Sequence, residues 1–191
     1  MAGIDEAGRG ALAGPVVAGA VILPEDAGLE TKLKGVRDSK QMTAIGRELW
    51  AAVIKNIAAG WAVGFASHDE IDEQGIVTAT LLAMRRALEQ LPYTPHHLLV
   101  DYLSIPGYPC PQTALVKGDA RSLSIAAASI LAKTSRDALM IAMDEQAPDY
   151  GFAAHKGYGT QAHLQALAHF GFSPFHRRSF RIKRGIENDG Q

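Results

Sequence analysis

The sequence contains one cysteine and almost no net charge, and both shortages exclude classes of protein. Cys110 has no second thiol with which to form a disulfide or a cysteine-based zinc site. No base lies near it in the sequence to make it a nucleophile. The 191 residues carry a formal net charge of -1, so no overall field favours a polyanionic partner. The basic stretch 176–184 is, by itself, equally well explained as a solvated tail.

Long hydrophobic runs are also missing. The apolar stretch Ala11–Leu23 is shorter than the roughly 20 residues that span a bilayer, and Pro15 interrupts it. Asp5 and Glu6 stand where a signal peptide would need a basic region. Together with the single thiol, which suits a reducing compartment, these features predict a soluble cytoplasmic protein with no membrane contact.

The remaining sequence alternates between strand and helix patterns, without repeats or low-complexity segments. The length suits a single domain over residues 1–191, with residues from about 150 onward forming a small C-terminal helical extension. An antiparallel pair at the N-terminus and a mixed α/β sheet of about five strands, flanked by helices, are expected. We expect strands at 2–7, 16–23, 61–66, 97–101 and 113–117, a helical turn at 68–74, and helices at 44–59, 76–91, 122–146 and 161–170.

Two of these helices carry apolar stripes at helical spacing, which should face the core. A third, the alanine-rich segment 122–146, has small side chains that let a helix lie close to a sheet. The first stripe comprises Ile45, Leu49, Val53 and Ile57, widened by Trp50 and Ile54, and the second comprises Leu81, Met84, Leu88 and Leu91.

Four acidic residues fall at the ends of expected strands: Asp5, Glu6, Asp101 and Asp119. Carboxylates in apolar strands are costly to bury unless they are paired or bind metal. Hard divalent cations take oxygen ligands, so the group indicates a hydrolytic metal site. Two ions held about 3.5–4 Å apart would clamp a phosphodiester, activate water and stabilise the leaving oxygen. Taken singly, each acid is more often a turn former or a helix cap.

The first two acids raise a geometric difficulty. Neighbouring strand residues point to opposite faces, so Asp5 and Glu6 cannot both reach one metal from a regular strand. Either the nearby glycines twist the chain, or Glu6 serves a second ion or uses its backbone carbonyl. The next triplet, Gly8-Arg9-Gly10, would let backbone amides approach a substrate and adds a cation, although a hairpin turn is the simpler explanation of the triplet alone.

Taken in order, several motifs resemble those of the ribonuclease HII family, and the resemblance covers nearly the whole chain. The motifs are GIDEAGRG at 3–10, AGPVV at 13–17, DSK at 38–40, KGDA at 117–120, AAASILAK at 126–133, RD at 136–137, HKGYGT at 155–160 and HRRSF at 176–180.

The resemblance implies an RNase H-like fold and an endoribonuclease that hydrolyses the RNA strand of RNA/DNA hybrids. It also implies incision 5′ of single ribonucleotides in duplex DNA, which leaves 3′-hydroxyl and 5′-phosphate ends. Asp5, Glu6, Asp101 and Asp119 then correspond to the catalytic residues and to the ligands of two Mg²⁺ or Mn²⁺ ions. The partners expected are RNA/DNA hybrid and ribonucleotide-containing duplex DNA, bound by a monomer.

The resemblance also implies substrate contacts. Gly8, Arg9 and Gly10 correspond to a loop that reads the 2′-hydroxyl, the group that separates RNA from DNA, and that grips the adjacent phosphate. Tyr158 corresponds to a tyrosine that packs on the sugar beyond the RNA–DNA junction. The further phosphate contacts would be Lys40, His155, Lys156 and Arg177; without the resemblance these four would be solvated side chains, and Tyr158 an ordinary aromatic.

Two residues beside these motifs have no assigned chemistry. Asp137 is expected to hold a loop or a cap. Tyr102 follows Asp101 where the family pattern favours a small residue.

Three other functions compete with this interpretation. Ribonuclease HIII usually carries an extra N-terminal domain and a lysine at the position of Arg9. A catalytically silent nucleic-acid-binding module would use the basic tail, but four acids repel phosphate unless metal is present. A phosphate-transfer enzyme would need a glycine-rich anion cradle, and the sequence lacks both G-x-x-x-x-G-K-[S/T] and G-x-G-x-x-G.

Overall fold

The computed structural model describes residues 1–36 and 42–181, so Lys40 lies outside the described residues. The five expected strands and the longer helices are confirmed, and short helices join several of them. The strands are β1 (Ala2–Ala7), β2 (Val16–Ile22), β3 (Gly60–Ala66), β4 (Leu98–Asp101) and β5 (Gln112–Leu115); the helices are α1 (Leu29–Lys32), α2 (Ala44–Ile57), α3 (His68–Gln74), α4 (Ile76–Glu89), α5 (Gly118–Arg121), α6 (Leu123–Gln146), the 3₁₀ helix η1 (Pro148–Tyr150), α7 (Phe152–His155) and α8 (Gln161–Phe170).

The strands form one mixed sheet in the order β3-β2-β1-β4-β5. β1 and β2 pair antiparallel, as expected for the N-terminal hairpin, and β3 pairs antiparallel with β2. β4 lies parallel to β1, and β5 lies parallel to β4. The centre of the sheet is therefore β1, a strand with antiparallel pairing on one side and parallel pairing on the other.

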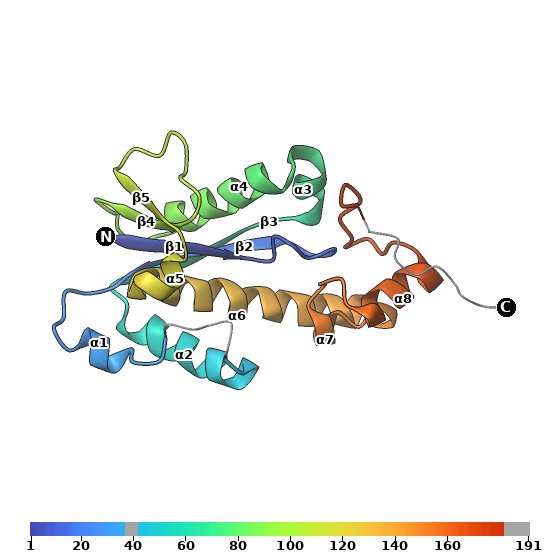
Figure 1. The fold of residues 1–191 in the computed structure, drawn as a ribbon, viewed down its shortest axis with the longest axis horizontal. Coiled ribbons are helices and arrows are strands. Elements are labelled where there is room, and N and C mark those ends of the chain that lie inside the picture. Colours follow the sequence, from blue (N-terminus) through green and yellow to red (C-terminus); the bar gives the residue numbers. More distant parts are fainter. Residues whose placement is uncertain (37–41, 182–191) are drawn as a thin grey trace.

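Helices cover both faces of this sheet (Figure 1). α3 and α4 lie on one face, and the long α6 crosses the other, with α2 packed outside it. The helices approach very closely because glycines face them. A Cβ at Gly19 of β2 would lie 2.3 Å from the Ala128 carbonyl oxygen of α6, and one at Gly64 of β3 would lie 2.3 Å from the Ala83 oxygen of α4. The alanine-rich segment thus packs as its composition predicts.

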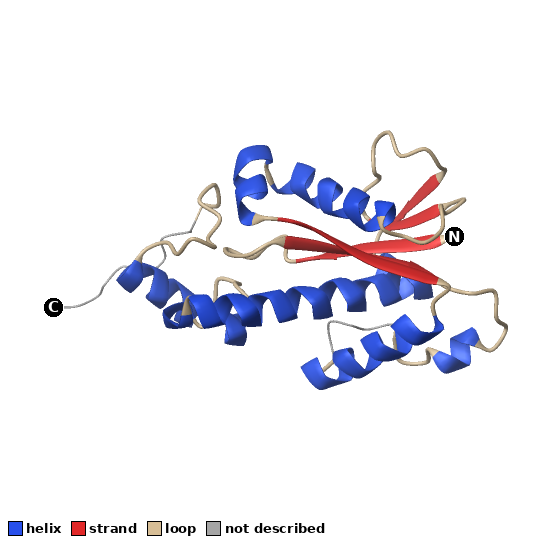
Figure 2. Cartoon of the chain, turned by 180° about the vertical axis from the view of Figure 1, so that it is seen from behind, coloured by secondary structure: helices blue, strands red, loops and turns tan. Residues whose placement is uncertain are grey.

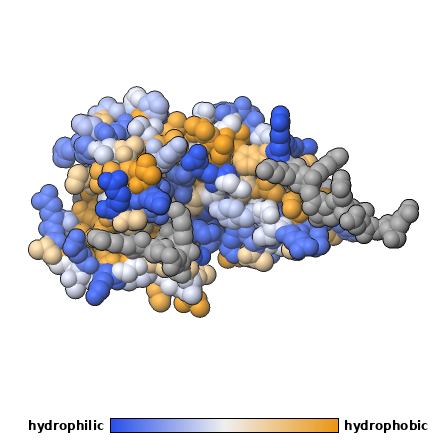
Figure 3. Space-filling view, in the orientation of Figure 1, coloured by the Kyte–Doolittle hydropathy of each residue, from blue (hydrophilic) through white to orange (hydrophobic). Residues whose placement is uncertain are grey.

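The prediction for the first apolar stripe is wrong in part. Ile45 is 71% exposed, Leu49 65% and Val53 39%, whereas Ala51 and Ile54 are the buried residues of α2. The reason is that α2 lies on α6 and not on the sheet (Figure 2), so it buries only a narrow strip of its surface. Orange surface at the lower edge of Figure 3 lies where Figure 1 places α2. On α4, Met84 and Leu88 are buried and Leu81 packs partly buried against the same core, as does Leu91, which follows the end of the helix.

The C-terminal extension packs around the far end of α6, with α7 and α8 in orange beside it (Figure 1). A small core of Ala13, Met140 and Phe152 joins this extension to the loop between β1 and β2. The segment after α8 is tied to α3, because Asp72 accepts hydrogen bonds from the backbone N–H groups of Arg178 (2.8 Å) and Ser179 (2.9 Å). Within residues 1–36 and 42–181, no helix is both long and apolar enough to cross a membrane.

Candidate active site

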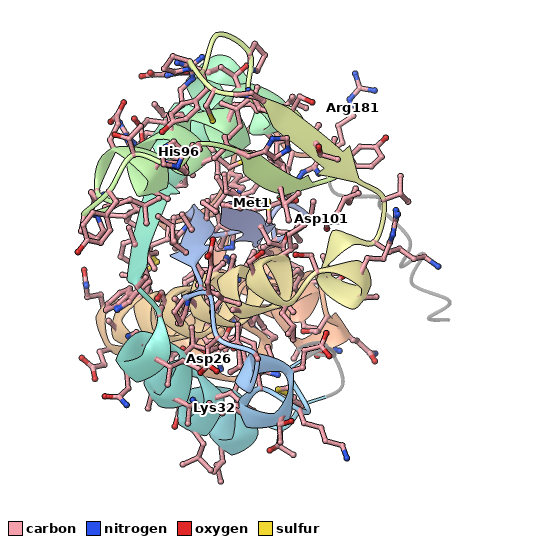
Figure 4. The ribbon with its side chains drawn as sticks, turned by 90° about the vertical axis from the view of Figure 1, so that its left-hand side faces the viewer. Met1, Asp26, Lys32, His96, Asp101 and Arg181 are labelled. Carbon is pink, nitrogen blue, oxygen red and sulfur yellow. The ribbon has the colours of Figure 1, made fainter. Side chains whose placement is uncertain are left out.

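The parallel pairing of β1 and β4 places two of the acids side by side. The paired residues end at Ile4 and Val100, and the next residue on each strand is an acid, Asp5 on β1 and Asp101 on β4. Both therefore lie at the carboxyl end of a parallel pair, where open α/β sheets commonly bind ligands. Figure 4 shows Asp101 between the end of its strand and the helices below.

Asp5 is buried, with 4% of its surface exposed. Burial, together with the negative charges of Glu6 and Asp101, raises its pKa to about 7, against a hydrogen bond from Ser129 that lowers it. Ser129 lies on α6, inside the alanine-rich run, and sequence reasoning did not single it out. Its position as the one polar residue of the run Ala126–Ala132 is the sequence signal that could have identified it.

Glu6 also interacts with the charge of Asp101, although neighbouring side chains on a strand point to opposite faces. Burial raises its pKa, Arg9 lowers it and Asp101 raises it. Its Oε1 accepts a hydrogen bond from Arg9 Nη1 at 3.2 Å. Its Oε2 is buried and has no hydrogen-bond partner. The strand stays in register here, with Glu6 opposite Ala18, so no β-bulge interrupts β1 at the two acids.

Asp119 lies in α5, next to a residue that contacts Asp101. The backbone N–H of Gly118 donates to Asp101 Oδ1 at 2.8 Å. Two non-glycine residues with positive φ flank these acids, Tyr102 (φ 63°) and Lys117 (φ 54°). Such conformations are costly and concentrate at functional sites. The positive φ at Tyr102 also explains why a small residue would suit the position after Asp101.

These observations test whether the acids fit a divalent cation. A buried, unpartnered carboxylate oxygen on Glu6 and a raised pKa on Asp5 are what a site with too much negative charge shows. Oxygen ligands of this kind suit Mg²⁺ or Mn²⁺. Among residues 1–36 and 42–181, no three acidic, histidine or cysteine side chains already have the spacing of a single metal site. The residues thus fit a divalent cation chemically, because its positive charge would offset the like charges of the neighbouring carboxylates.

A backbone hydrogen bond joins the two segments predicted to bind substrate, the Gly8-Arg9-Gly10 loop and the HKGYGT segment. In the Gly8-Arg9-Gly10 loop, Gly8 is buried and Gly10 is exposed. The N–H of Leu12 donates to the Gly157 carbonyl at 2.8 Å, which brings the HKGYGT segment beside this loop. The half-buried Tyr158 lies there, with the Arg136 guanidinium carbon 5.3 Å from its ring centroid.

The structure shows what several polar side chains named in the sequence analysis contact. Arg177 is 1% exposed, so a solvated side chain is the wrong description of it. His155 bonds to the Tyr150 carbonyl (2.7 Å), and Lys156 donates to the Ala153 carbonyl. Asp137 accepts from Lys133 at 2.7 Å and from Arg47 at 3.4 Å, which agrees with its predicted structural role.

Comparisons with known proteins agree with this architecture. A family model described as "Ribonuclease HII" matches residues 2–183. A curated "Ribonuclease HII" of Desulfitobacterium hafniense is 55% identical over 180 residues, which cover 94% of this chain and 68% of that protein.

Two solved structures share the fold. The ribonuclease H2 of Pyrococcus horikoshii has a TM-score of 0.79 and 28% identity, covering 94% of this chain and 92% of the other. The structure of Bst-RNase HIII in complex with Mn²⁺ has a TM-score of 0.65 and 18% identity, covering 89% and 62%. At that identity the second likeness concerns the fold alone.

Proposed function

Since the chain belongs to the ribonuclease HII family, and is thereby a ribonuclease H enzyme that acts on RNA/DNA hybrids, we propose that it also incises duplex DNA 5′ of a single embedded ribonucleotide. The reaction uses two divalent ions and leaves 3′-hydroxyl and 5′-phosphate ends. The observation that carries the proposal is the group of acids around Asp5 and Asp101, which emerge side by side from the parallel pair β1 and β4. The proposal includes action as a monomer with one catalytic domain.

The four acids hold the divalent ions in this proposal. Asp5, Glu6, Asp101 and Asp119 supply carboxylate oxygens, and the unpartnered Oε2 of Glu6 is a donor atom not otherwise used. When bound, Mg²⁺ or Mn²⁺ ions activate water and stabilise the leaving 3′ oxygen. Ser129 holds the Asp5 carboxyl group by a hydrogen bond that favours its charged, ligating form.

The loops beside the acids choose the cleavage position. In the proposal, Gly8, Arg9 and Gly10 contact the 2′-hydroxyl and its phosphate, since Arg9 already lies against the acids through its ion pair with Glu6. Tyr158 packs on the deoxyribose that follows the ribonucleotide. Lys40, outside the described residues, is proposed as a phosphate contact.

A DNA duplex with one internal ribonucleotide tests the proposal. We expect cutting on its 5′ side when Mg²⁺ or Mn²⁺ is present, no cutting with a chelator, and no cutting of the all-DNA duplex. Asp119→Asn should abolish cutting and leave the circular dichroism spectrum unchanged. Asp149→Asn changes an exposed acid in η1 and is the matched control, with wild-type rates expected. An uncut ribonucleotide duplex under both metals would refute the proposal.

A further inference from the structure

Two arginines of the C-terminal half are buried although their charge is costly to remove from water. Arg136 of α6 is 0% exposed, and Arg177 is 1% exposed. Burial lowers the pKa of both groups, that of Arg177 to about 9. Their hydrogen bonds show what these two side chains contribute to the fold.

Arg136 binds both predicted substrate segments. Its Nε donates to the Pro15 carbonyl at 2.9 Å and its Nη2 to the Ala13 carbonyl at 3.1 Å, at the end of the loop between β1 and β2. Its Nη1 donates to the Lys156 carbonyl at 2.9 Å, in the HKGYGT segment. The start of the same loop lies against it, because a Cβ at Gly8 would be 1.9 Å from Arg136 Nε. One planar side chain thus bridges two segments that are far apart in sequence.

Arg177 binds further carbonyl groups of the same loop. Its Nε donates to the Gly14 carbonyl at 2.9 Å and its Nη1 to the Arg9 carbonyl at 3.0 Å. Its own N–H donates to the Leu12 carbonyl at 2.9 Å. The carbonyls of the loop between β1 and β2 are therefore directed inward, toward two cations.

Tyr158 is positioned by the same group of contacts. The guanidinium of Arg136 faces its ring, and its carbonyl is hydrogen bonded to His163 Nδ1 at 3.0 Å. The two segments touch directly as well, since a Cβ at Gly157 would be 2.6 Å from the Ala13 oxygen. The spacing between the Gly8-Arg9-Gly10 loop and Tyr158 is thus set by a side chain that is fully buried.

We propose that Arg136, supported by Arg177, is a positioning residue that sets the distance between the Gly8-Arg9-Gly10 loop and Tyr158 and thereby selects a ribose followed by a deoxyribose. This rests on the proposed function, in which the loop reads the ribose and Tyr158 packs on the next sugar. A single ribonucleotide in DNA uses both contacts at once. Within a continuous RNA strand the next sugar is a ribose, so cleavage there does not use the Tyr158 contact with deoxyribose.

The test compares two substrates for each variant. Arg136→Lys keeps the positive charge but loses the planar fork that binds three carbonyls. We expect kcat/KM on the single-ribonucleotide duplex to fall on the order of 10- to 100-fold more than on a uniform RNA/DNA hybrid, since small misplacements of a binding group have effects of that size. Arg177→Lys should shift the substrate ratio in the same direction, and it provides a second variant if Arg136→Lys fails to fold.

A double-mutant cycle and two controls separate positioning from general destabilisation. If Arg136 acts through Tyr158, adding Arg136→Lys to Tyr158→Ala should cost little more on the single-ribonucleotide duplex. Arg86→Lys changes an arginine whose guanidinium binds Glu70 and the Phe65 carbonyl, which belong to neither segment, and it should leave the ratio unchanged. Ile54→Ala, which loses buried contacts in the core between α2 and α6, should lower the melting temperature without changing the ratio.

The outcomes are distinguishable. Equal losses on both substrates, or additive effects in the cycle, would overturn the positioning role while the proposed function stands. A wild-type protein that leaves the single-ribonucleotide duplex uncut would instead refute the proposed function itself.

Discussion

The buried pair His163 and His176 makes the stability of the C-terminal extension sensitive to acid. His163 Nδ1 must donate to the Tyr158 carbonyl (3.0 Å), so its Nε2 accepts from His176 Nε2–H at 2.9 Å. His176 Nδ1 then accepts from the N–H of Ser173 at 2.9 Å and from its hydroxyl at 2.7 Å. Both nitrogens of His176 are occupied in its neutral form, and a second proton would face the Ser173 N–H.

The magnitude follows from the pKa of His176. Burial, and then the repulsion that a protonated His176 would have with a protonated His163, lower the pKa from 6.5 to about 4. The unfolded chain takes up a proton near pH 6.5 and the folded protein only near pH 4, so stability is lost as the pH falls through that window. A difference of about 2.5 pKa units corresponds to about 3–4 kcal/mol in the free energy of unfolding at about 1.4 kcal/mol per unit. His176 is 1% exposed, so solvent screening reduces this little.

The assay is urea unfolding at steps between pH 4.5 and pH 8, for the wild type and for His176→Gln, which keeps a donor for His163. The raised pKa of Asp5 acts in the opposite sense, but it is common to both proteins and cancels in the difference. We expect the wild type to lose most of this difference of about 3–4 kcal/mol relative to the variant on acidification. Parallel curves for the two proteins would refute the assignment of the proton positions.

Three further predictions concern packing and metal. Ile54→Ala should lower the free energy of unfolding by about 2–5 kcal/mol, because Ile54 is fully buried. Leu49→Ala, at an exposed position of the same helix, should change it by less than about 0.5 kcal/mol. Urea unfolding measures both values. Gly19→Ala should lower the free energy of unfolding by about 1–3 kcal/mol or more, because the added Cβ overpacks against the Ala128 carbonyl. Gly10→Ala has nothing within 4 Å of the added Cβ, so its melting temperature should stay near that of the wild type. Added Mg²⁺ should raise the wild-type melting temperature, since a ligand of the folded state stabilises it; Asp5→Asn should lose this increase, and an equal increase in both proteins would remove Asp5 from the metal site.

Local signals in the sequence were sufficient for most of the secondary structure. Thr43 and Thr160 cap α2 and α8 through their side chains, directly before the residues at which the two helices were expected to begin, because a cap depends on residues within one turn. The apolar stretch of β2 and the alanine-rich α6 are formed as predicted, since a strand covered on both faces and a closely packed helix each need a distinctive composition. The family resemblance rests on short motifs that occur in order along the chain, from GIDEAGRG to HRRSF. The match of the family model over residues 2–183 confirms it.

What lies against each element was decided by the tertiary structure. The pattern of Ile45 and Leu49 predicts an apolar face, but only the position of α2 on α6 decides that this face stays exposed. Arg136 and Arg177 are cations that a sequence places at the surface, and their burial depends on carbonyl groups from segments more than 100 residues away.

The sequence by itself determined the strands, the long helices and the acids at strand ends, because these follow from short-range periodicity and residue type. The register that sets Asp5 beside Asp101, and the contacts that join the Gly8-Arg9-Gly10 loop to Tyr158, were decided only in the folded chain. The physical reason is that burial and charge–charge proximity depend on distances between segments, which short-range patterns do not contain.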